Sequence, residues 1–197
     1  METNDKTLTA EESIVLIQQM INKTKSSMRD NSFYFLLWGW LSVIASTGNF
    51  IVLKFGLNPY FHFFWFIIPV VGMPVSIWHG YKNPFVKTHI GDFISGIWSG
   101  IGIACFVIIA LIFINGRQDL PIIQMFLLIM GIGVFVTGRI IKDIPLIIGS
   151  VIFWLGAMAC SLFKSESAQL LIYSFSFTVG YIIPGYITKY KNRKSHV

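Results

Sequence analysis

Apolar residues are gathered into six blocks of about 20 residues, and no Asp, Glu, Lys or Arg interrupts any of these blocks. An α-helix rises about 1.5 Å per residue, so about 20 residues cross a hydrocarbon core of about 30 Å. The pattern therefore predicts an all-α, polytopic membrane protein. The predicted spans are 33–53, 60–79, 93–114, 121–138, 144–163 and 168–187.

Composition agrees with a chain that lies almost entirely in the membrane. Only 12% of the 197 residues are charged and 54% are hydrophobic, whereas soluble domains are about 25% charged. Residues 33–188 are expected to form one transmembrane domain, between a polar segment at 1–32 and a basic tail at 189–197. We expect no separate soluble domain within these residues.

Acidic residues stand just before three of the predicted spans, at Asp92, Asp119 and Asp143. A short acidic side chain can accept hydrogen bonds from the free N–H groups of a helix's first turn. We therefore expect these three residues to cap helices. No carboxylate then remains inside the predicted spans to serve in a proton relay.

Lysine and arginine are distributed unequally between the two sides of the predicted membrane domain. One side carries twelve of the 15 basic residues, and the other carries only Lys54, Arg117 and Lys164. Because basic loops favour the cytoplasm, both termini are predicted to face it. The net charge of +6 is expected to meet anionic lipids of the inner leaflet, at about 1 kcal/mol for each nearby base. Nucleic acid is not an expected partner, because the bases are divided among short loops and two tails.

Residues 9–29 have the pattern of an amphipathic helix on the cytoplasmic side. The face that we interpret as a partner-docking face carries Ile14, Ile17, Ile21 and Met28. Such a helix can lie on the inner leaflet or pack against the end of the bundle. It can equally dock a cytosolic protein partner or form the seam of a homo-oligomer, and the sequence leaves these alternatives open.

A few small and polar residues inside the spans suggest contacts between helices. Gly96 and Gly100 have the GxxxG spacing that lets two membrane helices approach closely, within one chain or between copies. Asn49 and Gln124 both lie toward the outer ends of their spans, where a small polar pocket would bring them together. Neither pair identifies a ligand.

Tryptophan and proline inside the spans suggest further packing features. Trp98 and Trp154 lie deep in their spans and are expected to pack against glycines of other helices. Pro74 and Pro184 interrupt the second and sixth spans. Backbone groups freed by such breaks line binding sites in some transporters, but the same breaks also simply shape a bundle.

Three segments bear on the family of the chain: ESIVLIQQMINKTK near the N-terminus, SFYFLLWGWL in the first span, and GRIIKDIPLIIGSVIFW in the second half. Together they resemble a family of small uncharacterised multipass inner-membrane proteins of bacteria. The resemblance implies a bacterial inner membrane as the location. It implies no activity, cofactor or site residue.

Two classes of function fit these observations. The first is a non-enzymatic membrane module that binds or tethers a cytosolic or membrane partner, and the second is a small carrier or channel for a neutral or weakly polar solute. The lack of charge inside the predicted spans argues against proton or ion coupling and so favours the first class. We expect no enzyme, metal or cofactor, because the chain has no HExxH, no GxSxG and no paired carboxylates within the spans.

Overall fold

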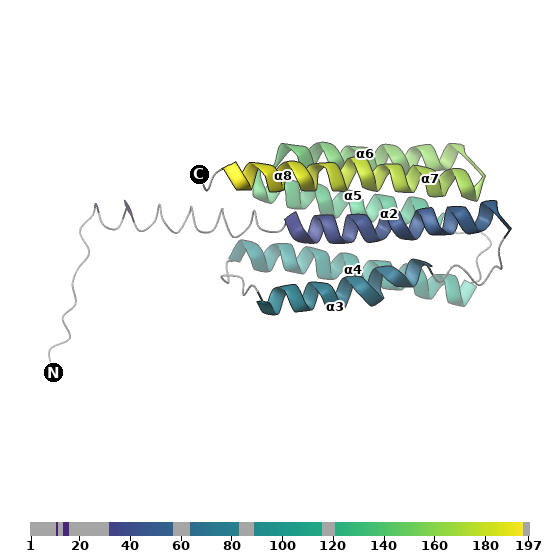
Figure 1. The fold of residues 1–197 in the computed structure, drawn as a ribbon, viewed down its shortest axis with the longest axis horizontal. Coiled ribbons are helices and arrows are strands. Elements are labelled where there is room, and N and C mark those ends of the chain that lie inside the picture. The colour runs from purple at the N-terminus through teal and green to yellow at the C-terminus, as the bar shows by residue number, and fades with distance from the viewer. Residues whose placement is uncertain are drawn as a thin grey trace.

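The computed structural model describes residues 11, 14–15, 32–56, 64–82, 89–115 and 121–194, and their regular structure is helical. Three of its elements, α7 (Glu166–Phe177), η2 (Thr178–Ile182) and α8 (Ile183–Lys194), follow one another without a break and form a single rod (Figure 1). The elements are α2 (Ser32–Lys54), α3 (Ile67–Lys82), α4 (His89–Asn115), α5 (Ile122–Ile141), α6 (Ile144–Leu162), α7 (Glu166–Phe177), η2 (Thr178–Ile182) and α8 (Ile183–Lys194).

Six helical segments of the described chain are long and apolar enough to cross a bilayer, which indicates a multipass membrane protein. Each overlaps one predicted span, so the all-α prediction and the six span positions agree with the structure. α4 begins at His89 rather than 93 and α7 at Glu166 rather than 168, and Asp92 and Glu166 therefore lie in the first turns of these helices. The segments are Ser32–Lys54, Phe64–Lys82, Gly91–Leu111, Ile122–Ile141, Ile144–Leu162 and Glu166–Tyr190.

The helices run up and down alongside one another (Figure 1). We call the end of the bundle where α2 begins and α8 ends the terminal end. α6 packs against α5 and against the continuous rod of α7, η2 and α8, while α2 packs along the same rod. α3 adjoins α2 and α4 adjoins α5. The bundle thus has a centre of α2, α5, α6 and the rod, with α3 and α4 on its flank.

The turn between α5 and α6 lies at the terminal end. Lys142 ends α5 in the left-handed conformation, with φ 55°, and the N–H of Asp143 donates to the carbonyl of Gly138 at 2.9 Å. This arrangement satisfies a carbonyl of the last turn and reverses the chain within two residues. The two helices are therefore held side by side as an antiparallel pair.

The acidic residues do not act as the predicted caps. Asp143 occupies the N-cap position of α6 but makes no side-chain cap hydrogen bond, because its carboxylate accepts a hydrogen bond from the hydroxyl of Thr188 on α8. Asp92 lies inside the first turn of α4 rather than before it. Asp143 thus has the predicted cap position without the predicted side-chain bond, Asp92 is not a cap, and Asp119 lies outside the described residues.

Aromatic rings fill the centre of the bundle. Phe153 of α6 and Phe177 of α7 are buried and meet edge to face, with ring centroids 4.9 Å apart. Tyr181 of η2 continues the cluster, with its ring 5.1 Å from that of Phe35 on α2. Such edge-to-face pairs are worth about 0.5–1.5 kcal/mol beyond the area they bury. The cluster joins α2, α6 and the rod into one core.

α6 and η2 touch backbone to backbone at a pair of glycines. A Cβ added to Gly180 would lie 2.8 Å from the carbonyl oxygen of Gly149, and one added to Gly149 would overlap the carbonyl of Gly180. Pro184 has no N–H to donate to the carbonyl of residue 180, and the chain forms the π-helical η2 just before it. The predicted break in the sixth span is thus a π-helical turn at its closest contact with α6.

Glycines of α5 accommodate the two deep tryptophans, as predicted. The indole of Trp154 on α6 covers Gly131, so closely that a Cβ at Gly131 would overlap it. Trp98 of α4 lies over Gly133, 3.7 Å from the position of a Cβ there. The ring of Trp154 therefore needs the absence of a side chain at Gly131, whereas at Gly133 it is Ile101 of α4 that a Cβ would overlap, and Trp98 makes an ordinary contact there.

α3 and α4 are buried far less than the other helices. Only 6% of the α3 span and 11% of the α4 span is buried within the described structure, against 33–50% for the other four spans. Pro74 lies inside α3 without interrupting it. The flank of the bundle therefore has little contact with the centre in the described structure.

Candidate functional site

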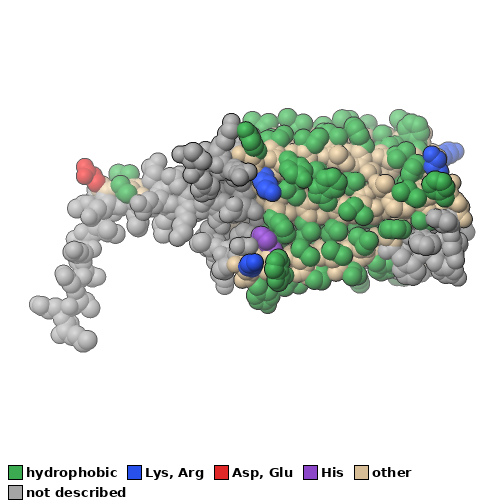
Figure 2. All heavy atoms as spheres, in the orientation of Figure 1, with side chains coloured by type: hydrophobic (Ala, Val, Ile, Leu, Met, Phe, Trp, Pro, Cys, Tyr) green, Lys and Arg blue, Asp and Glu red, His purple; other side chains and the backbone are tan. Residues whose placement is uncertain are grey.

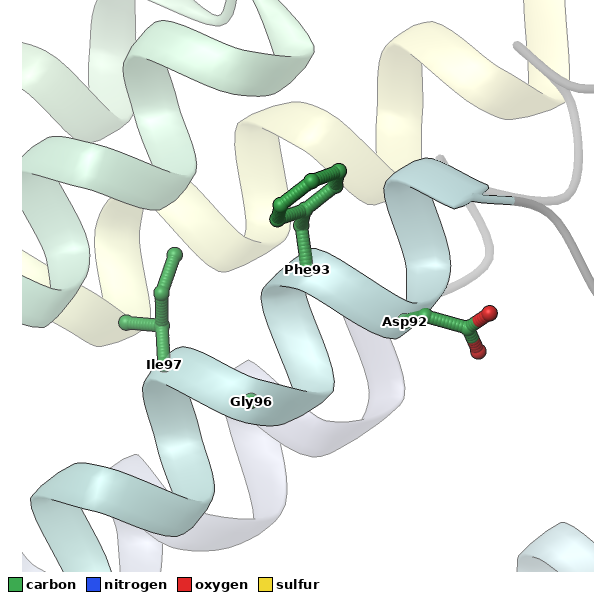
Figure 3. Close-up of a pocket in the computed structure, with 4 residues that line it drawn as sticks. All are labelled: Asp92, Phe93, Gly96 and Ile97. Atoms are coloured by element: carbon green, nitrogen blue, oxygen red, sulfur yellow. The ribbon is translucent and has the colours of Figure 1, made fainter.

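A shallow, open hollow lies on the first three turns of α4 among the described residues. It has a volume of about 540 Å³ and is lined by Asp92, Phe93, Gly96 and Ile97. Phe93 and Ile97 are one helical turn apart and project from the same side of α4, with Gly96 between them (Figure 3). The described lining of this hollow is apolar except for Asp92, whose side chain points away from Phe93 and Ile97.

Asp92 is exposed. Its position in the first turn of α4 is favourable for a negative charge. In Figure 3 the carboxylate points away from the hollow's apolar wall, beyond the start of the helix. A polar or cationic group at this end of α4 can reach it.

Trp98 connects the region of the hollow to the core. It follows Ile97 in α4, and its ring lies 6.5 Å from that of Phe35 and 6.2 Å from that of Tyr181. α4 is therefore fastened to α2 and η2 by this one indole among the rings that the structure describes. The hollow beside it stays open, because the residues that line it face away from these contacts.

A groove of about 540 Å³ lies on α2, against Phe64 at the start of the second span. Thr47 is its only hydroxyl-bearing lining residue among those described, and this hydroxyl lies 3.4 Å from that of Ser174 on α7. Gly48 packs directly against the ring of Phe64. No charged residue of the described chain lines this groove.

A histidine joins α2 and α3 at the terminal end. The ring of His79 stacks on that of Phe33 at 3.9 Å with an angle of 8° between the planes, and Tyr34 meets His79 edge to face. The Tyr34 hydroxyl also reaches the backbone carbonyl of Ser76, at 3.5 Å. These contacts attach α3 to α2 and explain why His79 is better understood as a packing residue than as a ligand.

Charged and apolar side chains are separated over the surface. On the face drawn in Figure 2, hydrophobic side chains cover the flanks, and lysine and arginine appear only toward the two ends. The ammonium group of Lys82 lies 5.1 Å from the ring of Trp78 at the end of α3. This pairing of a long basic side chain with an aromatic ring is typical of a membrane interface.

The predicted polar pocket remains a prediction. Asn49 is buried on α2, and its amide donates to the carbonyl of Ala45 at 2.8 Å within the same helix. Gln124 is half-buried on α5. No hydrogen bond between these two side chains is found in the described part of the chain, and neither lines the hollow on α4 or the groove on α2.

The other predicted sites have different positions. Gly96 and Gly100 both face open space, with no atom of the described chain within 4 Å of an added Cβ. Close packing at this pair, within the chain or between copies, therefore stays a prediction. The predicted amphipathic helix at 9–29 and its docking face lie outside the described residues, apart from Glu11, Ile14 and Val15.

Sequence reasoning missed the hollow on α4 and the interaction between Asp143 and Thr188. Asp92 was recognisable only as an acidic residue beside a span, and the one available signal for a hollow was the small residue four positions later. Thr188 lies 45 positions from Asp143, so no local pattern links them. In the described residues, no three His, Cys, Asp or Glu side chains are placed to hold a metal ion.

The centre of the bundle is thus closed by rings, while its flank carries a shallow apolar hollow beside one carboxylate. The chain matches no protein-family model, and neither the curated proteins nor the solved structures contain a match to it.

Proposed function

We propose that this multipass membrane protein is a non-enzymatic module that binds or tethers a cytosolic or membrane partner. The observation that carries the proposal is the contrast between its centre and its flank. Phe153, Phe177 and Tyr181 occupy the centre with exposed fractions of 0–2%, which leaves little room for a solute to pass between them. α3 and α4 present long apolar faces that the described chain does not cover.

The proposal includes the cellular setting. We place the protein in the inner membrane of a bacterium, with both termini in the cytoplasm and its basic residues against anionic lipids. The amphipathic segment at 9–29 would then stand at the terminal end, where a cytosolic protein can reach it. Its apolar face, centred on Ile17 and Ile21, is the surface that we propose for docking, and the same face is available to a second copy of the chain.

The direct test is chemical cross-linking in native membranes, followed by purification and identification of the attached proteins. We would compare the full chain with Ile17→Asp and Ile21→Asp on the proposed face. Val15→Asp is the matched control, because it adds the same charge to the opposite side of the predicted helix. A partner lost with the first two variants and kept with the third supports docking. An identical set of attached proteins in all variants rejects it.

The orientation has its own test. Lys54→Cys and Lys87→Cys place a thiol on opposite sides of the membrane in the proposed topology. A reagent that does not cross membranes should label Lys54→Cys in intact cells and label Lys87→Cys only after lysis. Labelling of Lys87→Cys in intact cells would reverse the proposed orientation.

One observation favours a second candidate, a small carrier or channel for a neutral or weakly polar solute. The sixth span contains the π-helical η2 just before Pro184, and π-helical turns are frequent at functional sites. Osmotic swelling of proteoliposomes in glycerol and in urea distinguishes the candidates. Swelling that depends on the protein supports the carrier, and swelling equal to that of empty liposomes rejects transport of these two solutes.

A further inference from the structure

The rod of α7, η2 and α8 is attached to different neighbours on the two sides of its π-helical turn. On the α7 side, the amide of Gln169 donates to the carbonyls of Cys160 and Phe163 at the end of α6. On the α8 side, the hydroxyl of Thr188 donates to the carboxylate of Asp143 in the turn between α5 and α6. Because η2 lies between these two attachments, a change in its winding would turn α8 relative to α7.

The hydrogen bonds of η2 determine how far α8 would turn. The N–H of Ile183 donates to the carbonyl of Thr178, five residues earlier, whereas in an α-helix it would donate to that of Val179. The π turn thus contains one residue more than an α-helical turn, and each residue of an α-helix turns the chain by about 100°. If η2 rewound as α-helix, each side chain of α8 would take the direction now held by the next one.

Two features of the rod reduce the number of contacts that such rewinding must break. Pro184 has no N–H and therefore donates no backbone hydrogen bond in either winding. Gly180 meets Gly149 of α6 backbone to backbone, so no side chain of Gly180 has to pass α6. Since π-helical turns are rare, we expect a contact outside η2 to hold the rod in this form. The bond from Thr188 to Asp143 lies directly beyond the turn and fixes the direction of α8.

We propose that η2 is a conformational hinge, and that the hydrogen bond between Thr188 and Asp143 is the latch that holds it in the π-helical form. When the latch is released, η2 rewinds as α-helix and α8 turns by one residue. Ile187, which is 39% exposed, then takes the place of Thr188, which is 4% exposed, and Thr188 moves outward. Lys189 turns with them, so the hinge changes the charged surface at the terminal end. The hinge requires neither partner docking nor transport.

The alternative is a fixed π turn that only accommodates Pro184. In that case the bond between Thr188 and Asp143 is one contact among many, and its loss loosens α8 without turning it. The two cases differ when one residue is removed from η2. A rod shortened by one residue can be α-helical throughout and still hold α8 in its present direction, so a hinge that has been removed in this way needs no latch.

A pair of cysteines on α2 and α8 reports the direction of α8. A Cβ at Gly185 would lie 3.2 Å from a methyl carbon of Leu36. Leu36→Cys and Gly185→Cys therefore face each other in the present form and can join in a disulfide. In the rewound rod Pro184 takes the place of Gly185, which turns away by about 100°. Neither cysteine position belongs to η2 or to the latch.

The experiment is oxidation of the full chain carrying both cysteines in native membranes, with the remaining free thiols counted by a maleimide of high mass. Thr188→Val removes the hydroxyl of the latch, and Thr188→Ser keeps it as the matched control. A hydrogen bond to a charged group favours one form by about ten-fold or more, so Thr188→Val should slow cross-linking about two-fold or more. Thr188→Ser should cross-link at the original rate. Variants with only one added cysteine account for the native thiols of Cys105 and Cys160.

Deletion of Val179 distinguishes a hinge from a fixed turn. Combined with Thr188→Val, this deletion should restore the original rate of cross-linking, because the shortened rod holds α8 in its present direction without the latch. Deletion of Leu171 in α7 is the matched control. It should prevent folding, because it turns Tyr173 and Phe177 out of the core, where both are buried.

Three outcomes would overturn the proposal. An equal rate of cross-linking in Thr188→Val and Thr188→Ser would show that the hydroxyl holds nothing in place. A rate that Thr188→Val lowers and the deletion of Val179 fails to restore would show that α8 is loosened rather than turned. Loss of the helical circular dichroism spectrum on deletion of Val179, as on deletion of Leu171, would show that η2 contains no residue that the rod can lose.

Discussion

The centre and the flank of this bundle are built from equally apolar helices, yet they differ sharply in how those helices are used. The span of α6 has a mean hydropathy of 2.0 and is 39% buried, whereas that of α4 has a mean hydropathy of 2.2 and is 11% buried. In a bilayer, lipid is as apolar as a protein core, so hydrophobicity alone does not drive one helix against another. How much of a helix is buried depends instead on how well its surface fits the surfaces of its neighbours.

The glycines of α6 and α4 differ in whether a neighbouring helix fits against them. Gly149 of α6 meets the backbone of Gly180, and Gly156 meets the side chain of Ser176. On α4, by contrast, Gly96 and Gly100 meet nothing in the described chain. Glycine brings two helices together only where the facing helix has a group that fills the space left by the missing side chain.

Gly149→Leu should have the largest effect. The new side chain would overlap the carbonyl of Gly180, and a backbone cannot yield as a flexible side chain can, so the cost should exceed the usual overpacking range of about 1–3 kcal/mol. We expect the purified protein to aggregate or lose its sharp thermal transition. Gly100→Leu is the control and should melt within a few degrees of the wild type. Similar melting temperatures for both would contradict the comparison.

Phe153→Ala should come next. The ring is fully buried against Phe177 and Tyr181, and its removal leaves a cavity at a cost of about 3 kcal/mol. Phe106→Ala on α4 removes the same ring from a position that is 72% exposed, and should cost less than about 0.5 kcal/mol. Urea unfolding in mixed micelles measures both. Equal losses would mean that α4 is covered in the protein as purified.

Thr188→Val should have an intermediate effect. The substitution keeps the shape of the side chain but removes the hydroxyl that donates to Asp143, and the loss of such a bond to a carboxylate costs about 1–2 kcal/mol. A double-mutant cycle with Asp143→Asn measures the coupling between the two residues. If the effects of the two single substitutions simply add, the hydrogen bond between Thr188 and Asp143 contributes nothing to stability.

Tyr34→Phe should have the smallest effect. The hydroxyl lies 3.5 Å from the carbonyl of Ser76, at the long limit for a hydrogen bond, and the ring contact with His79 remains after the substitution. We expect a change below about 0.5 kcal/mol in the free energy of unfolding. A larger loss, in the same micelles as above, would show that α3 depends on this hydroxyl and is less separate from the centre than its burial suggests.

Much of the fold could be predicted from the sequence because the bilayer sets the length of an apolar helix. The six spans follow from that rule, and the glycine contacts of Trp98 and Trp154 follow from the size of an indole. The cap predictions failed at Asp92 and Asp143 because the same carboxylate can accept a hydrogen bond locally or from a distant residue, and Thr188 is 45 positions away.

The candidate site was beyond prediction for a related reason. The spacing of Gly96 and Gly100 indicates a smooth helix surface, but it does not say whether that surface meets another helix or stays open. The open hollow beside Asp92 exists because α4 turns Trp98 and Ile101 toward its neighbours and leaves the opposite residues outward. Hydropathy cannot show which of two apolar faces of a helix packs against a neighbouring helix.

The sequence by itself determined that this chain has six helices long and apolar enough to cross a membrane, and where those helices lie, because water and lipid act on each segment separately. The tertiary structure alone decided which helices form the centre, which glycines are in contact, and where a carboxylate borders an apolar hollow. Those outcomes depend on the fit between surfaces far apart in the chain, and in a bilayer that fit is the main force that selects one arrangement of helices.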